Sequence, residues 1–214
     1  MNDCFTTPYE MSDGLSPQHV WFTSDTHFYH ANAIGYCNRP FSSVDEMNEA
    51  LVNRWNTVVQ EGDIVFHLGD FCFGCAKKWN RMLDLLKGRI FLILGNHDVG
   101  HLTPQLSARF EGVSPQMLLN ISGQRIYLNH FPFLTYSGDT RGVWQLFGHI
   151  HSHQLNCNIA TTQQMALLQP GQYDVGVDNN DYSPVSFRKV QEIMMKRGHC
   201  NVSNGKPIIT KALH

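Results

Sequence analysis

The sequence contains few charged residues and almost no net charge. Asp, Glu, Lys and Arg make up 16% of its 214 residues, and the formal net charge is -2 at pH 7. Proteins that bind duplex DNA or an anionic membrane normally carry a clear excess of Lys and Arg on the surface that makes the contact. We therefore expect neither a stable complex with duplex nucleic acid nor binding to a membrane.

Long apolar runs and a leader pattern are also lacking. No stretch approaches the roughly 18 consecutive apolar residues of a membrane-spanning helix. The first 16 residues contain Asp3, Glu10 and Asp13 but no basic segment ahead of an apolar one, so we expect no signal peptide.

The six cysteines lack the regular spacing of a disulfide framework. In a chain of this length we therefore expect reduced thiols and a cytoplasmic location. Cys72 and Cys75 form a Cys-x-x-Cys pair, but a zinc ribbon requires a second pair and the sequence has none. The role of these two residues stays open.

The length fits one domain with a complete hydrophobic core. We expect a polar N-terminal extension over residues 1–18, the domain itself over 19–198 and a C-terminal tail over 199–214. Hydrophobic residues make up 42% of the chain, as in ordinary globular proteins.

Strands and helices alternate in the first half of the chain. Apolar, β-branched and aromatic segments predict buried strands at His19–Ser24, Ile64–Leu68 and Arg89–Leu94. Helical periodicity predicts helices between them, at 43–58 and 76–87, and Ser43 with Glu46 has the form of a capping box. Such alternation is typical of a largely parallel sheet.

The second half predicts a different arrangement. Two strands joined through Ser122 and Gly123 form a hairpin, and further strands and a helix follow. The predicted elements are strands at Gln116–Ile121, Gln124–Asn129, Val143–Phe147 and Tyr173–Asp178, a loop at 154–172 and a helix at 185–197.

The chain contains 12 histidines, which is an unusually large number, and several of them follow predicted strands. Asp25 and His27 are spaced i, i+2 after a strand, as are His149 and His151, so each pair leaves the chain on one side. The strand-end residues with metal-ligand or proton-transfer chemistry are Asp25, His27, Asp70, Asn96, His97, His130, His149 and His151.

These side chains are expected to share one site. The carboxyl ends of parallel strands lie at one edge of a sheet, where open α/β folds bind ligands. Converging polar groups are costly to bury unless something binds them. Carboxylate and imidazole together suit Mn²⁺, Fe²⁺, Zn²⁺, Co²⁺ or Ni²⁺. The donors are too numerous for one tetrahedral ion and fit two ions about 3.5–4 Å apart.

Two other polar strand residues are assigned local roles. Asp63 precedes the strand Ile64–Leu68 and is expected at the edge of the sheet opposite Asp70, in turn or cap chemistry. His67 lies within that strand and is expected to pack or hydrogen-bond rather than bind metal.

Five blocks along the chain resemble the calcineurin-like metallophosphoesterase superfamily. They are Asp25-Thr26-His27, Gly69-Asp70, Gly95-Asn96-His97-Asp98, His130 and Gly148-His149-Ile150-His151. Two further segments, 23–32 and 173–178, resemble its small single-domain bacterial and phage members. The resemblance implies a four-layer α/β/β/α sandwich with a dinuclear metal site at the carboxyl ends of the strands.

The resemblance also implies roles for individual residues. Asp25, His27 and His151 would hold the first ion, Asn96, His130 and His149 the second, and Asp70 would bridge both. His97 would face the substrate rather than a metal, beside Asn96, which makes His97 and Asp70 the expected catalytic residues. Arg39 and His30 follow the first metal block, and on that ground we expect them to contact substrate.

The expected reaction is the hydrolysis of a small phosphoester. A water bridging two divalent ions loses its proton near neutral pH, and the hydroxide attacks phosphorus in line. We expect a phosphodiesterase acting on nucleotide-like or cyclic-nucleotide substrates, because a short chain leaves little room for a cap domain. Mn²⁺ is the ion that we expect to support activity best in vitro.

The sequence is also compatible with other functions. A phosphomonoesterase and a catalytically silent protein-binding scaffold of the same fold stay open, as does a homodimer. A metallo-β-lactamase type is disfavoured because its His-x-His-x-Asp-His run is not present after His149.

Overall fold

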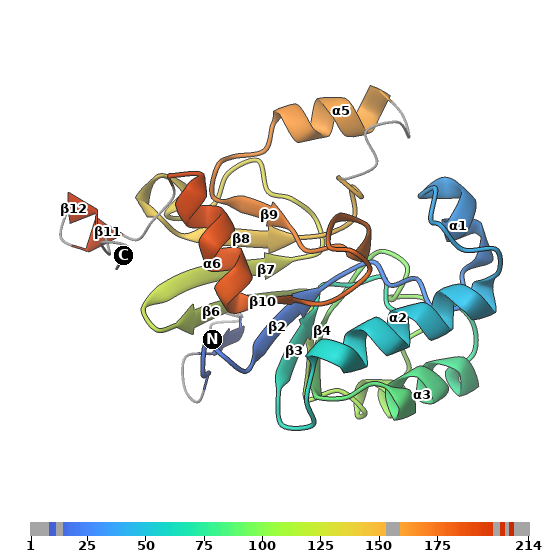
Figure 1. The fold of residues 1–214 in the computed structure, drawn as a ribbon. Helices are drawn as coiled ribbons and strands as arrows, with labels where there is room; N and C mark the ends of the chain where they lie inside the picture. The colour runs from blue at the N-terminus through green and yellow to red at the C-terminus, as the bar shows by residue number, and fades with distance from the viewer. Residues whose placement is uncertain (1–8, 12–14, 153–158, 199–201, 204–205, 208–214) are drawn as a thin grey trace, which may run out of the picture.

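Two five-stranded sheets pack face to face in the computed structural model of the protein (Figure 1). The structure describes residues 9–11, 15–152, 159–198, 202–203 and 206–207. Helices flank the sheets, and the mixed α/β sandwich expected from the sequence is confirmed.

The first sheet has the order β10-β2-β3-β4-β5. β2, β3, β4 and β5 run parallel, and the short β10 is antiparallel to β2 at the edge. Because β2, β3 and β4 are parallel neighbours, the residues that follow them all lie at one edge. The bounds are β2 Val20–Thr23, β3 Ile64–His67, β4 Arg89–Ile93, β5 Gly112–Ser114 and β10 Val185–Ser186.

Two helices cover the outer face of this sheet (Figure 1). They are α2 (Val44–Val58) and α3 (Ala76–Leu85), both predicted from helical periodicity. Trp55 and Trp79 from these helices pack with sheet residues in one buried cluster. The Ser43 hydroxyl caps α2 by accepting from the Glu46 N–H, but the Glu46 carboxylate accepts from Ser42, so the reciprocal half of the capping box is displaced by one residue.

The second sheet has the order β1-β6-β7-β8-β9. The predicted hairpin forms β6 (Gln116–Ile121) and β7 (Gln124–Asn129), and β8 (Trp144–Phe147) and β9 (Gln172–Asp174) add parallel strands beside β7. The fifth strand, β1 (Tyr9–Met11), pairs with β6. It falls in the stretch expected to be a polar extension, so part of that stretch belongs to the sheet.

The core between the sheets combines side chains from both of them with those of α6 (Phe187–Lys196). This helix starts two residues later than predicted, because Val185 and Ser186 pair with β2 and the Ser186 hydroxyl then caps the helix. The predicted strand 173–178 also ends early. Val177–Asn179 form the 3₁₀ helix η2, after a turn in which the Asp174 carboxylate accepts from the Gly176 N–H.

The prediction of a loop over 154–172 is wrong for its central part, where Ile159–Ala166 form α5. Residues 153–158 lie outside the described residues. The remaining elements are short: α1 Ala31–Tyr36, α4 Pro104–Ser107, η1 Asp139–Arg141, β11 Val202–Ser203 and β12 Lys206–Pro207. None of the helices that the structure describes is long and apolar enough to span a bilayer.

Candidate metal centre

The turns that follow β2, β3, β7 and β8 are joined by backbone hydrogen bonds across the edge of both sheets. Asp25 N–H donates to the Gly69 carbonyl at 2.9 Å, and His27 N–H donates to the Asp70 carbonyl at 3.0 Å. Gly148 N–H donates to the His130 carbonyl at 3.0 Å. Backbone hydrogen bonds alone therefore fix the position of the chain at these strand ends.

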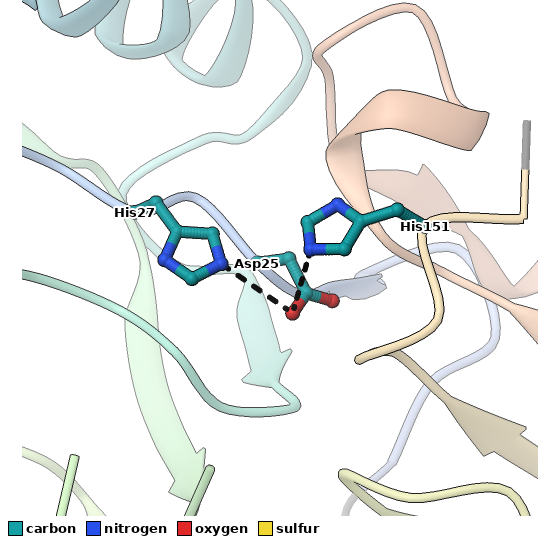
Figure 2. A group of neighbouring side chains, drawn as sticks. All are labelled: Asp25, His27 and His151. Atoms are coloured by element: carbon teal, nitrogen blue, oxygen red, sulfur yellow. Dashed lines mark ion pairs between the residues drawn. The ribbon is translucent and has the colours of Figure 1, made fainter. Parts of the chain in front are cut away.

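Asp25, His27 and His151 form the first group of donors, in which the ligand atoms lie within 4.8 Å of one another. Asp25 Oδ1 is 3.9 Å from His27 Nε2 and 3.9 Å from His151 Nε2 (Figure 2). This carboxylate is only 1% exposed, and Oδ1 has no hydrogen-bond partner among the described residues. Metal–ligand bonds of about 2.0–2.2 Å fit such a gap. The unpartnered oxygen and the two facing nitrogens therefore fit a divalent ion.

Asp70, His130 and His149 form the second group. His130 Nδ1 donates to the Leu68 carbonyl at 2.7 Å, which leaves Nε2 as the lone-pair nitrogen of the neutral ring. That Nε2 lies 3.0 Å from Asn96 Oδ1 and 3.5 Å from Asp70 Oδ2. Three acceptor atoms facing one another call for a shared cation or an extra proton, and the set of one nitrogen and two oxygens suits a divalent ion.

Asp70 lies between the two groups. Its Oδ2 is 3.5 Å from His130 Nε2 in the second group and 3.8 Å from His27 Nε2 in the first. Burial raises the pKa of Asp70 to about 6, against the opposing effect of His130, and the nearby Asp25 carboxylate adds to the rise. A carboxylate in this position can bridge two ions.

Five of the six residues in these two groups have backbones in the left-handed region. The φ values are 56° for Asp25, 50° for His27, 56° for Asp70, 68° for His149 and 46° for His151. Non-glycine residues adopt this conformation uncommonly, at a cost of order 1–3 kcal/mol each. The strain is concentrated where donor side chains must converge, which is typical of a functional site.

Asp25 is also held through its second oxygen. Oδ2 accepts from the His149 N–H at 2.9 Å, so one residue of the second group fixes the carboxylate of the first. The approach is close because Gly148 has no side chain. A Cβ there would collide with Asp25 Oδ2 and Ser24 Oγ.

Arg39 does not have the role expected from the sequence. It is 4% exposed, and its Nε and Nη2 form a bidentate ion pair with Asp178 at 2.8 Å. Nη2 and Nη1 also donate to the carbonyls of Asp25 and Thr26. Its donors are therefore used inside the protein, and the prediction that Arg39 contacts substrate is wrong.

Asp178, which carried no role in the sequence interpretation, orients the ring of His151. His151 Nδ1 donates to Asp178 Oδ2 at 2.6 Å, which directs Nε2 of the ring towards Asp25. Burial alone would lower the pKa of His151, but the hydrogen bond to Asp178 raises it to about 11. Burial alone would raise the pKa of Asp178. The contacts with His151 and Arg39 outweigh the effect of burial and hold the pKa of Asp178 below its usual range. Histidine ligands are commonly oriented by such carboxylates.

His97 and His30 lie at the opening of the site. Together with Asn96 and four residues of the donor groups, they line a cavity of about 420 Å³; the four are His27, Asp70, His149 and His151. His97 is partly exposed, its backbone N–H donates to Asp70 Oδ1 at 2.9 Å, and its Nε2 lies 3.9 Å from Asp70 Oδ2. The substrate contacts expected of both histidines stay predictions.

Phe73 is a further residue that the sequence interpretation missed. Its ring stacks on His30 with centroids 3.8 Å apart, and it lies 4.9 Å from the His97 ring and 5.6 Å from the His27 ring. The only signal in the sequence is its place three residues after Asp70. It falls between Cys72, which is buried, and Cys75, which is exposed beside α3.

Asp98 is fully buried and stabilises the turns that follow β3 and β4. Its carboxylate accepts from the backbone N–H groups of Asp70, Phe71 and Gly95, at 2.8, 2.9 and 2.8 Å. It therefore ties the turn after β3 to the turn after β4.

The two local assignments are confirmed. Asp63 accepts from the indole of Trp21 and the backbone N–H of Gln60 and contacts His19 Nδ1, at the opposite end of the strands. His67 contacts the Thr26 hydroxyl at 2.9 Å and is fully buried, which lowers its pKa to about 3.

Replacing Gly148 with alanine is expected to empty the first donor group. The added Cβ meets Asp25 Oδ2 and Ser24 Oγ, so the carboxylate must leave its position. Elemental analysis should then find one equivalent of divalent metal less than in the wild type. Gly100→Ala is the matched control, because a Cβ at Gly100 meets nothing within 4 Å. Equal metal content in the two variants would contradict the placement of Asp25 as a ligand.

Asp178→Asn is expected to weaken metal binding about 10–100-fold, because His151 loses the charged partner that orients it. Titration calorimetry with Mn²⁺ measures the affinity, and a thermal melt measures stability separately. Glu49→Gln, at an exposed position of α2, removes one negative charge without touching the site. If Asp178→Asn melts earlier but binds Mn²⁺ as tightly as Glu49→Gln does, Asp178 has only a structural role.

Comparison with known sequences agrees with this geometry. A sequence model of the family described as calcineurin-like phosphoesterase matches residues 18–206. An uncharacterized protein of Methanocaldococcus jannaschii, MJ1445, is 35% identical over 186 residues, which cover 85% of this chain and 94% of that protein. The gene 66 protein of Mycobacterium phage L5 is 30% identical over 161 residues, covering 62% of this chain and 77% of that protein.

A solved structure has the same fold. The protein of unknown function AQ665 from Aquifex aeolicus superposes with a TM-score of 0.61 at 25% sequence identity, over 81% of this chain and 98% of that one. The family match spans most of the chain, including both donor groups and every strand from β2 to β10. The chain therefore belongs to the calcineurin-like phosphoesterase family.

Proposed function

We propose that this protein is a phosphodiesterase that holds two divalent ions and acts on nucleotide-like or cyclic-nucleotide substrates. The observation that carries the proposal is the buried Asp25 Oδ1, which lacks a protein partner among the described residues and faces two imidazole nitrogens. Membership of a phosphoesterase family supports metal-dependent hydrolysis of a phosphoester.

Each ion has a distinct set of donors in this proposal. Asp25, His27 and His151 would hold the first ion. His130, His149 and Asn96 would hold the second, and Asp70 would serve both. Ions bound there would supply Lewis acidity towards the phosphoryl oxygens and would lower the pKa of a bound water towards neutral pH. The mixed nitrogen and oxygen donors fit Mn²⁺, and we propose it as the ion for assays.

His97 acts as the proton donor to the leaving group. Its backbone is anchored on Asp70 through the 2.9 Å hydrogen bond, and its ring packs on Phe73, so the imidazole is held at the opening of the cavity. His30 stacks on the other side of that cluster and offers a second donor to a phosphoryl oxygen. General acid catalysis of this kind contributes about 10²–10⁴-fold to a rate.

A diester is favoured over a monoester by the charge of the cavity walls. Among the described residues that line it, none is Lys or Arg, and the polar groups are imidazoles, amides, the Asp70 carboxylate, the Tyr36 phenol and the Cys37 thiol. A monoester dianion is normally held by additional cationic side chains. A diester carries a single negative charge, which the metal centre alone can balance.

The Mn²⁺-loaded protein is expected to hydrolyse bis(p-nitrophenyl) phosphate with a higher kcat/KM than p-nitrophenyl phosphate. Asp70→Asn should lose both activities and retain at most one equivalent of metal, because the anion shared by both ions is gone. Release of nitrophenol and elemental analysis measure the two effects.

Two outcomes would contradict the proposal. A higher kcat/KM for the monoester would assign the protein as a phosphomonoesterase. Two full equivalents of metal in Asp70→Asn would exclude the bridging role of Asp70.

His97→Ala is expected to keep both metal equivalents and to lower kcat about 10²–10⁴-fold for a diester with an alkoxide leaving group. The loss should be smaller with a nitrophenolate leaving group, which departs without being protonated. His101→Ala serves as the control, because His101 is an exposed histidine outside the cavity lining. An equal loss with both leaving groups would show that His97 does not deliver the proton.

A further inference from the structure

A second hollow adjoins the metal cavity. It has a volume of about 250 Å³ and is lined by residues 131–134 together with His149, Ile150, Gln164, Leu167 and Leu168. His149, Ile150 and Gln164 also line the cavity of about 420 Å³ beside the candidate metal centre. The two hollows are therefore neighbours that share a wall. This wall includes His149, a candidate metal ligand of the second donor group.

The walls of this second hollow are apolar and open to solvent. Phe131, Leu134 and Leu167 are 44%, 73% and 64% exposed, and they are three of the seven large hydrophobic side chains that the described residues leave exposed. Exposed apolar side chains that gather beside a polar site are typical of a ligand-binding surface.

The aromatic wall is held in place by buried polar groups. The fully buried Gln145 donates to the Phe131 carbonyl at 2.9 Å and accepts from the Phe133 N–H at 3.0 Å. Gln172, also buried, donates to the Phe133 carbonyl at 2.7 Å. Two glutamines from the second sheet thus fix a loop whose side chains remain exposed, which is the arrangement of a preorganised binding site.

Phe131 links this wall to the metal centre. Its ring meets the rings of His149 and His130 edge-on, with centroids 4.5 and 4.9 Å away. A group bound against Phe131 therefore lies next to the second donor group.

The size and chemistry of the hollow restrict its occupant. Its volume lies below the roughly 300–1,000 Å³ of sites for drug-sized ligands, so it fits one ring system. The lining residues include no Asp, Glu, Lys or Arg, and the polar groups are the His149 ring and the Gln164 amide at the shared wall. An uncharged planar ring with polar edges matches these walls.

We infer that this hollow is a ring subsite, which binds the planar ring of a phosphoester whose phosphorus lies at the metal centre. The inference rests on the proposed function and narrows its substrates to esters that carry a nucleobase or an aryl group. Both sources share the same chemistry, a flat unsaturated ring one linker away from the phosphate.

Binding of two matched pairs of probes, one of phosphonates and one of phosphate monoesters, tests the subsite. Calorimetry on the Mn²⁺-loaded protein compares phenylphosphonate with methylphosphonate, and adenosine 5′-monophosphate with ribose 5-phosphate. Burial of one ring is expected to strengthen binding about tenfold or more within at least one pair. The pair with the larger preference identifies the source of the ring.

Leu134→Ser and Leu167→Ser test the location. Both side chains are exposed, so the changes leave the packed core intact, and each should reduce the preference for the ring-bearing probe at least threefold. Met195→Ser, on α6 and also apolar and exposed, is the matched control and should keep the wild-type preference.

Failure of the inference differs from failure of the proposed function. Equal affinities within both pairs, or an unchanged preference in both leucine variants, would overturn the ring subsite even if diesters are hydrolysed. Lack of hydrolysis of any nitrophenyl phosphoester with Mn²⁺, Ni²⁺, Co²⁺ or Zn²⁺ would instead overturn the proposed function.

Discussion

The Asp25 carboxylate is the constraint on which the rest of the site depends. It is buried, one oxygen is satisfied by the His149 N–H, and the other faces two imidazole nitrogens without a protein donor. An uncompensated buried charge is expensive, and Asp70 adds a second carboxylate nearby. Cations bound at this position would stabilise a fold that keeps both, and metal binding would then be coupled to folding stability.

The arrangement of the two sheets meets this constraint. The first sheet delivers Asp25, His27 and Asp70, and the second delivers the three histidines that follow β7 and β8. The turns at these ends adopt left-handed backbones that an unconstrained chain would avoid, and neighbouring strands hold them in that conformation. Arg39 and Asp178 add a buried ion pair that connects the turn after β2 with the orientation of His151.

The sequence predicts the main strands and the convergence of the donors, because each donor directly follows a strand whose apolar pattern is clear. The sequence is a poorer guide to residues and strands whose place depends on contacts with distant parts of the chain. Arg39 lies near the first metal block in sequence, yet its partner is 139 residues away, and this distant contact turns an expected substrate contact into an internal support. β1 and β10 are too short to be recognised from a pattern and form because β6 and β2 offer free edges. Phe73 has no local signature, since its role arises from three histidines that the fold brings around it.

Under the proposed function, the two hollows recognise different parts of a substrate. The metal cavity lacks Lys and Arg among its described lining residues, so under the proposed function the attraction for a phosphoester would come from ions held by its carboxylate and imidazoles. Such attraction depends on charge and differs little between one diester and another. Discrimination therefore has to come from contacts beyond the phosphate, and the apolar wall of Phe131, Leu134 and Leu167 lies beside the second donor group. Binding energy released against that wall can position the phosphorus in the adjacent cavity, which links substrate choice to the geometry of the reaction.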